Sequence, residues 1–227
     1  GKTFFLRILE KKIGEETFLD DKEDRIIASY ITAGFPKPPS SYIHYVYSQC
    51  MKRIGFEKFE KFVKALDKIK DKKDLLGDFD RDFGNALLNF ENNKLVAWAY
   101  INGDTIDRTD AKIIEVSRSI KGNERSLASF LAFLKLLHIL DYRSFIILID
   151  EFEYLFAGGS RQGAQFLNTF RFIFDRVVEM SSREDIANPI FVPACSIFTW
   201  REQIMEGAEK QALGTKPFVD RVLKPVT

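Results

Sequence analysis

The chain contains little cysteine and histidine, and its charges almost cancel. Its 227 residues include two cysteines, Cys50 and Cys195, and two histidines. The two cysteines have no metal-ligand spacing, which argues against a zinc site, and they fit a reducing cytosol. Lys and Arg number 34 against 33 Asp and Glu, a net charge of +1. Any contact with nucleic acid would therefore depend on a local patch rather than on a global field.

A long uninterrupted hydrophobic run is also missing. The longest apolar stretch, SLASFLAFLKLLHIL, is interrupted by Lys135 and His138 and is too short to span a bilayer. The first residues show no signal-peptide pattern. We therefore expect a cytoplasmic protein with no membrane partner.

What the chain does contain is typical of a globular α/β protein. Hydrophobic residues make up 45% and charged residues 30%, and the 22 phenylalanines predict a core rich in aromatic rings. The length allows one substantial core with an appended subdomain. Apolar runs predict strands at 25–31, 145–150 and 188–196, alternating with helices, so we expect a parallel sheet covered by helices on both faces.

Hydrophobic periodicity predicts most of the helices. It indicates helices at 4–14, 42–55, 57–73, 75–90 and 126–140, a long helix through 166–178, and a helical turn at TWREQIMEG. The first helix is expected to bury residues 5, 8, 9 and 13. The stretch KLVAWAYINGD is ambiguous between helix and strand. Residues 104–125 are polar and weakly patterned, which indicates a loop or a partly ordered insertion.

Two short motifs indicate chemistry. Gly1-Lys2-Thr3, fused directly to a helix, matches the end of the phosphate-binding loop G-x-x-x-x-G-K-[ST], although this triplet alone also occurs by chance. The strand FIILID ends in Asp150, followed by Glu151, where ligands of an open parallel sheet bind. Phosphoryl transfer needs one carboxylate to hold Mg²⁺ and one group to orient the attacking water, and Asp150 and Glu151 fit these roles. The alternative is a strand that simply ends in polar residues.

Together, and in this order, the motifs predict a P-loop NTPase. Gly1-Lys2-Thr3 resembles the end of a Walker A motif, and FIILIDE resembles the Walker B motif of the AAA+ and related STAND ATPases. IIASYITAG and SQCMKRIG resemble the origin-recognition-complex-like branch of this group. AWAYINGD and HILDYRSFIILIDEFEYL resemble the ATP-binding proteins of BREX-type phage-defence systems. Those proteins often have glycine where this chain has Asp141.

This resemblance implies a fold and a set of roles. The fold would be a three-layer P-loop NTPase of the ASCE/AAA+ type, with a helical insertion at 56–125 between its second and third strands. ATP and Mg²⁺ would be the cofactors. Gly1, Lys2 and Thr3 would bind the nucleotide, with Lys2 on the β- and γ-phosphates. Thr3 and Asp150 would ligate Mg²⁺, and Glu151 would polarise the attacking water.

The resemblance implies further site residues, each with a structural alternative. Ser196, or Thr199 as the second choice, would be the polar sensor at the end of the fourth strand, unless its hydroxyl only satisfies backbone groups. Arg221, in a segment similar to the fifth strand of this branch, would contact a γ-phosphate or a neighbouring subunit, unless it forms a structural ion pair. Arg201 is a second candidate for the neighbour contact. Glu153 is interpreted as a surface carboxylate or helix cap.

We expect residues 1–227 to be an ATPase core that lacks its first strand, the start of Walker A, the lid and any winged helix, and therefore part of a larger protein. Its expected function is ATP hydrolysis that drives conformational change in a self-associated or multi-subunit assembly, with DNA as a partner in genome defence or replication-like loading. The alternative is a nucleotide-gated scaffold or DNA-binding module with little or no turnover. A third interpretation is an α/β domain with two coincidental motifs.

Overall fold

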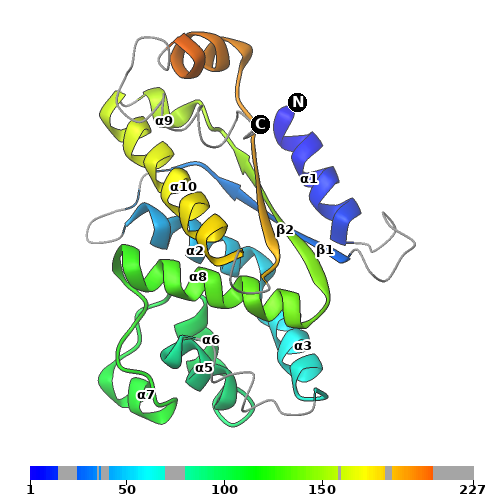
Figure 1. Ribbon diagram of the computed structural model, residues 1–227, viewed down its shortest axis with the longest axis vertical. Coiled ribbons are helices and arrows are strands. Elements are labelled where there is room, and N and C mark those ends of the chain that lie inside the picture. Colours follow the sequence, from blue (N-terminus) through cyan, green and yellow to red (C-terminus); the bar gives the residue numbers. More distant parts are fainter. Residues whose placement is uncertain are drawn as a thin grey trace.

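A computed structural model describes residues 1–14, 25–34, 36, 41–69, 80–157, 160–181 and 186–206 (Figure 1). The strands are β1 (Arg25–Thr32), β2 (Tyr142–Asp150) and β3 (Asn188–Pro193). The helices are α1 (Lys2–Gly14), α2 (Tyr42–Ile54), α3 (Phe56–Leu66), α5 (Arg81–Leu88), α6 (Lys94–Ile101), α7 (Arg108–Ile113), α8 (Gly122–Ile139), α9 (Tyr154–Ala157) and α10 (Ser160–Ser181), followed by a π-helical turn, η2 (Thr199–Met205).

The three described strands form one parallel sheet in the order β1-β2-β3. Thr32 pairs with Asp150, and Ile149 pairs with Pro193, so the carboxyl ends of all three strands lie at one edge. The central strand, β2, is almost entirely buried. That burial explains its unbroken apolar sequence, because a strand covered on both faces has no alternation of polar residues. The expected class, α/β with a parallel sheet flanked by helices, is confirmed.

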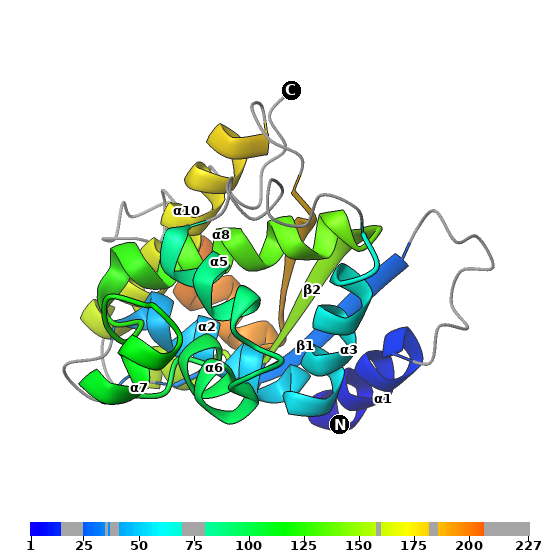
Figure 2. The same ribbon diagram turned by 90° about the horizontal axis from the view of Figure 1, so that it is seen from below.

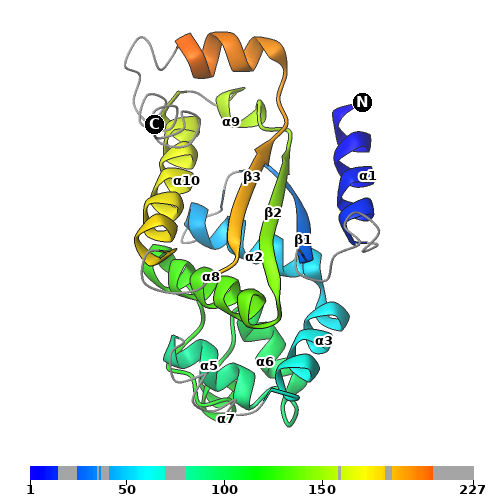
Figure 3. The same ribbon diagram turned by 45° about the vertical axis from the view of Figure 1, so that its right-hand side comes forward.

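Successive residues of β1 show which helix covers which face. The Ser29 hydroxyl donates a hydrogen bond of 3.2 Å to the carbonyl of Cys50 in α2. Tyr30, pointing the opposite way, packs its ring against Arg7 of α1. Side chains alternate along a strand, so α1 and α2 lie on opposite faces of β1. Helix α8 packs on both α2 and β2, and α10 packs on α2 (Figure 3).

Helices α3, α5, α6 and α7 gather below the sheet, beyond the amino ends of β1 and β2 (Figure 1). Figure 2, viewed from that end, shows these helices in front of the strands. The Tyr47 hydroxyl of α2 donates to the carbonyl of Ile101 in α6, which joins this layer to the rest of the core. The expected aromatic core is confirmed by its fully buried rings: Phe59, Phe83, Phe90, Phe130, Phe133, Phe145, Phe152 and Phe166.

The prediction for the buried face of α1 was right for Ile13 and wrong for Phe5 and Ile8. Leu6 and Ile13 are buried, whereas Phe5 is 64% and Ile8 is 42% exposed. Helix α1 has apolar residues on more than one side, so periodicity alone could not choose the face. Polar contacts with Tyr30 from Arg7 and Glu10 fix the side that meets β1.

Of the two alternatives predicted for 104–125, a loop or a partly ordered insertion, the loop needs correction. This stretch includes the helix α7, whose first turn is capped by Asp107 through hydrogen bonds to the N–H groups of Thr109 and Asp110. It also buries Ile114 and Ile120 completely. These apolar residues follow no regular period, which is why the pattern of the sequence did not indicate them.

The ends of other helices differ from the predicted ends by a few residues. The stretch KLVAWAYI, whose sequence is ambiguous between helix and strand, forms the helix α6. The helix expected at 57–73 ends at Leu66, and the one expected at 75–90 begins at Arg81 with Asp80 as its N-cap. Residues 70–79 lie outside the described part. Among the described helices, none has both the length and the apolar character needed to cross a membrane.

Candidate functional site

The amino end of α1 and the carboxyl ends of β2 and β3 lie at the same end of the sheet (Figure 3). Gly1 precedes the helix, and its carbonyl accepts the N–H of Phe5, 3.2 Å away, in the first turn. Lys2 donates from its ammonium to Glu153 Oε1, although the two residues are 151 positions apart in the chain. Their side chains remain 43% and 38% exposed. The fold thus brings the Gly1-Lys2-Thr3 triplet to the segment that follows FIILID.

Asp150, the last residue of β2, is 2% exposed, and its carboxylate accepts two hydrogen bonds. The Tyr30 hydroxyl donates to Oδ2 over 2.7 Å, and the N–H of Glu151 donates to Oδ1 over 2.9 Å. Burial raises the pKa of this carboxyl, but the side chains of Thr3 and Tyr30, the N–H of Glu151 and the charge of Lys2 outweigh burial, so the pKa lies below its usual value. Asp150 is therefore an anion held in one orientation.

Glu151 begins the turn that leaves the sheet, and it has a left-handed backbone with φ of 53°. Its side chain is exposed. Its carbonyl accepts the N–H of Tyr154 at 2.8 Å, and the next N–H, from Phe152, donates to the carbonyl of Ala194 at 3.2 Å. A left-handed conformation is uncommon for glutamate, so these backbone contacts hold the turn in place.

Glu153 forms an ion pair with Lys2, a contact that the sequence did not indicate. Within the described residues its Oε2 atom is buried without a hydrogen-bond partner, while Oε1 accepts from Lys2. Its negative charge adds to burial in raising the pKa of the Cys195 thiol, and the charge of Lys2 opposes them. A buried carboxylate oxygen without a partner is costly, which marks this pair as an arrangement that a ligand could replace.

Ser196 and Thr199 lie beyond the carboxyl end of β3. The Ser196 hydroxyl accepts the N–H of Thr199 at 3.1 Å and lies 3.0 Å from the Thr199 hydroxyl. The Ser196 hydroxyl thus satisfies a backbone N–H at the start of η2, which is the structural alternative for this residue. Arg201, in η2, is exposed. Arg221 lies outside the described residues.

The residue that sequence reasoning missed is Tyr30. It lies on β1, two residues before the Thr32 that pairs with Asp150, and therefore on the same face of the sheet as that carboxylate. The signal that could have found it is a polar aromatic residue close to the carboxyl end of a predicted strand. The strand register was needed to place it beside Asp150.

The donor atoms at this site suit Mg²⁺. Asp150 and Thr3 offer carboxylate and hydroxyl oxygens, which are hard ligands of the kind that Mg²⁺ prefers. The described residues hold no group of three or more His, Cys, Asp or Glu side chains arranged for a metal. Mg²⁺ bound with a nucleotide does not need such a group, because phosphates and waters complete its shell. The site therefore fits Mg²⁺ only together with an anionic ligand.

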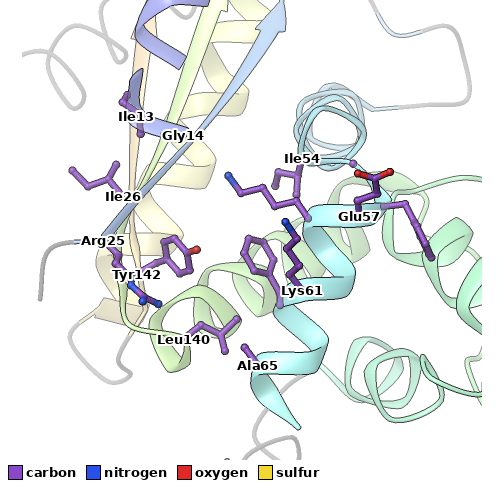
Figure 4. A pocket seen from close by; sticks show the side chains of 14 residues that line it. Ile13, Gly14, Arg25, Ile26, Ile54, Glu57, Lys61, Ala65, Leu140 and Tyr142 are labelled. Atoms are coloured by element: carbon purple, nitrogen blue, oxygen red, sulfur yellow. The ribbon is translucent and has the colours of Figure 1, made fainter. Parts of the chain in front are cut away.

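A cavity of about 800 Å³ lies elsewhere, between the end of α1, the starts of β1 and β2, and α3 (Figure 4). Its lining includes Arg25, Lys61, Phe62 and Tyr142. Arg25 and Tyr142 begin their strands, so this cavity is at the opposite end of the sheet from Asp150.

No protein-family model, no curated protein and no solved structure matches this chain. We therefore infer function from the geometry and the residues of the chain itself.

Proposed function

We propose that this chain is the core of a P-loop ATPase with the three-layer fold, related to the AAA+ and STAND ATPases. The observation that carries the proposal is the ion pair between Lys2 and Glu153, which joins the start of α1 to the segment directly after Asp150. Two motifs from distant parts of the chain meet at the edge of a parallel sheet where nucleotides bind. A pair of coincidental motifs would have no reason to do so.

The roles follow from charge and position. The amino end of α1 and the Lys2 ammonium favour the phosphates of ATP, because both are positive. Thr3 and Asp150 would hold Mg²⁺, which would supply positive charge next to the transferred phosphoryl group. Glu151 is exposed and adjacent to Asp150, so its carboxylate is available to orient a water for attack. Lys2 must leave Glu153 when the phosphates bind.

ATP binding by the intact protein tests the proposal. Lys2→Ala removes a cationic donor, and a hydrogen bond to a charged group contributes about 1.5 to 3 kcal/mol, so ATP affinity should fall by at least about tenfold. The matched control is Lys12→Ala, which removes the same charge at the other end of α1. Titration calorimetry measures both. Equal affinity of the Lys2→Ala and Lys12→Ala proteins would contradict the P-loop proposal.

A scaffold that binds ATP without turnover is the second candidate. The ion pair that holds Lys2 on Glu153 favours it. Glu151→Gln distinguishes the two functions. For an ATPase, ATP should still bind while turnover falls by at least about a hundredfold, the lower range for loss of a general base. Undiminished turnover of the Glu151→Gln protein would assign the role of general base to Glu153. An intact protein that binds ATP but never hydrolyses it, even with partners, would be the scaffold.

DNA as a partner, a role in genome defence or replication-like loading, and a cytoplasmic location are also proposed, on the resemblance of the Walker-like segments alone. The near-zero net charge requires a local basic patch for DNA contact. Measuring DNA binding over a series of salt concentrations tests this part, because phosphate contacts weaken steeply as salt rises.

A further inference from the structure

Tyr30 contacts both halves of the proposed nucleotide site. Its hydroxyl donates to Asp150 Oδ2 at 2.7 Å, and its backbone N–H donates to Glu10 Oε1 in α1 at 2.9 Å. Helix α1 begins with Lys2 and Thr3, and β2 ends with Asp150. One residue of β1 is therefore attached to the helix that would bind phosphate and to the carboxylate that would serve the metal.

The ring of Tyr30 is fixed by two arginines. The Arg7 guanidinium carbon lies 5.5 Å from the ring centroid, and that of Arg53 lies 5.7 Å away. Arg53 is in turn held by Glu10, with its Nε 2.8 Å from Oε1. Cation–π contacts and a carboxylate–guanidinium pair leave the ring little freedom to move. The hydroxyl is thus presented to Asp150 by a rigid support.

The support comes from one face of α1. Arg7 and Glu10 are three residues apart, which places them on one side of a helix. Both contact Tyr30. They connect α1 to β1 through polar contacts.

We propose that Tyr30 is a positioning residue of the nucleotide site, which orients the Asp150 carboxylate for a divalent cation bound with the nucleotide. This inference rests on the proposed function. Tyr30 occupies one lone pair of Oδ2, the Glu151 N–H occupies one of Oδ1, and a carboxylate has about four such positions. At least one direction stays open, and the hydrogen bonds decide where it points. Partners of this kind typically change metal affinity or activity by about 10- to 100-fold when removed.

The test uses Tyr30→Phe, which keeps the ring and its arginine contacts and removes one hydroxyl. Binding of Mn²⁺, as a paramagnetic substitute for Mg²⁺, is measured by electron paramagnetic resonance on the intact protein saturated with ADP. We expect Mn²⁺ affinity to fall by at least about tenfold, while the affinity for ADP without metal stays unchanged.

Tyr45→Phe is the matched control, because Tyr45 also uses its hydroxyl for one hydrogen bond, to the Thr32 carbonyl at 2.9 Å. It should leave Mn²⁺ affinity within about twofold of wild type, since Tyr45 does not contact the carboxylate. Thermal unfolding of both variants shows whether the fold is kept. Equal Mn²⁺ affinity of Tyr30→Phe and Tyr45→Phe would overturn the inference alone, whereas a wild-type protein that binds no Mn²⁺ with ADP would overturn the proposed function and the inference with it.

Discussion

Two neighbouring carboxylates at the end of β2 differ in almost every physical respect. Asp150 is buried and accepts hydrogen bonds from Tyr30 and the Glu151 N–H, which favour its ionised form. Glu151 is exposed and has a left-handed backbone. A fixed, desolvated anion suits the coordination of a cation, and an exposed carboxylate suits contact with water. The difference arises because β2 ends between them.

Asp141 is a non-glycine residue with a backbone conformation that favours glycine. It follows α8 with φ of 63°, and its N–H donates to the carbonyl of His138 at 2.9 Å. This is the left-handed position after a helix, which glycine adopts at little steric cost. Asp141→Gly should therefore raise the free energy of unfolding by about 0.5 to 1 kcal/mol, measured by urea denaturation.

Asp141→Ala serves as the control for that substitution. It removes the same carboxylate but keeps Cβ, so it relieves no backbone strain and should not stabilise the protein. If the glycine variant were less stable than the alanine variant, the left-handed geometry would not be the reason for any effect at this position.

At the scale of elements, the loop from Glu151 to α9 is joined to α1 by the Lys2–Glu153 pair and to the end of β3 by the Phe152–Ala194 hydrogen bond. Phosphates that take Lys2 would release Glu153 from the first of these contacts. Nucleotide binding would then change the contacts of the segment that carries Glu151.

Replacing Glu153 tests this competition. Glu153→Gln removes the charge that holds Lys2, and an exposed ion pair contributes about 0.2 to 1 kcal/mol, so ATP should bind about 1.5- to 5-fold more tightly. Glu179→Gln is the control, since Glu179 pairs with Arg176 at 2.7 Å on α10 and should not change ATP affinity. Weaker ATP binding by Glu153→Gln would show that Glu153 supports the nucleotide instead of competing with it.

The strands could be predicted from the sequence because the sequences of buried parallel strands are short apolar runs. Their common edge followed from the rule for open sheets, and it placed Asp150 and Glu151 there. The buried face of α1 could not be predicted, because Phe5 and Ile8 are as apolar as Leu6 and Ile13. Tyr30 could not be identified either, since the register between β1 and β2 is a property of the folded sheet.

At the scale of the whole molecule, the helices α3, α5, α6 and α7 lie at the opposite end of the sheet from the proposed nucleotide site (Figure 1). The end that bears the site also bears η2 and its exposed Arg201. ATPases of the resembled group complete their sites with an arginine from a neighbouring subunit. The placement of Arg201 at the site-bearing end makes it the described candidate for that contact, beside Arg221 outside the described residues.

An arginine supplied by a neighbour neutralises charge on the transferred phosphoryl group and raises turnover by about 10³ to 10⁵. ATPase activity per subunit should therefore rise with protein concentration, or with DNA that assembles subunits, and Arg201→Ala should abolish the rise without changing ATP affinity. Arg108→Ala, which removes an exposed arginine from α7 at the other end, should keep it. Mixing Arg201→Ala with Lys2→Ala should restore part of the activity, because each subunit supplies what the other lacks. If ATPase activity of the Arg201→Ala protein still rises with concentration, the contact belongs to Arg221 or another residue. If the activity of the wild-type protein stays constant from dilute to concentrated solution, with and without DNA, each subunit works alone.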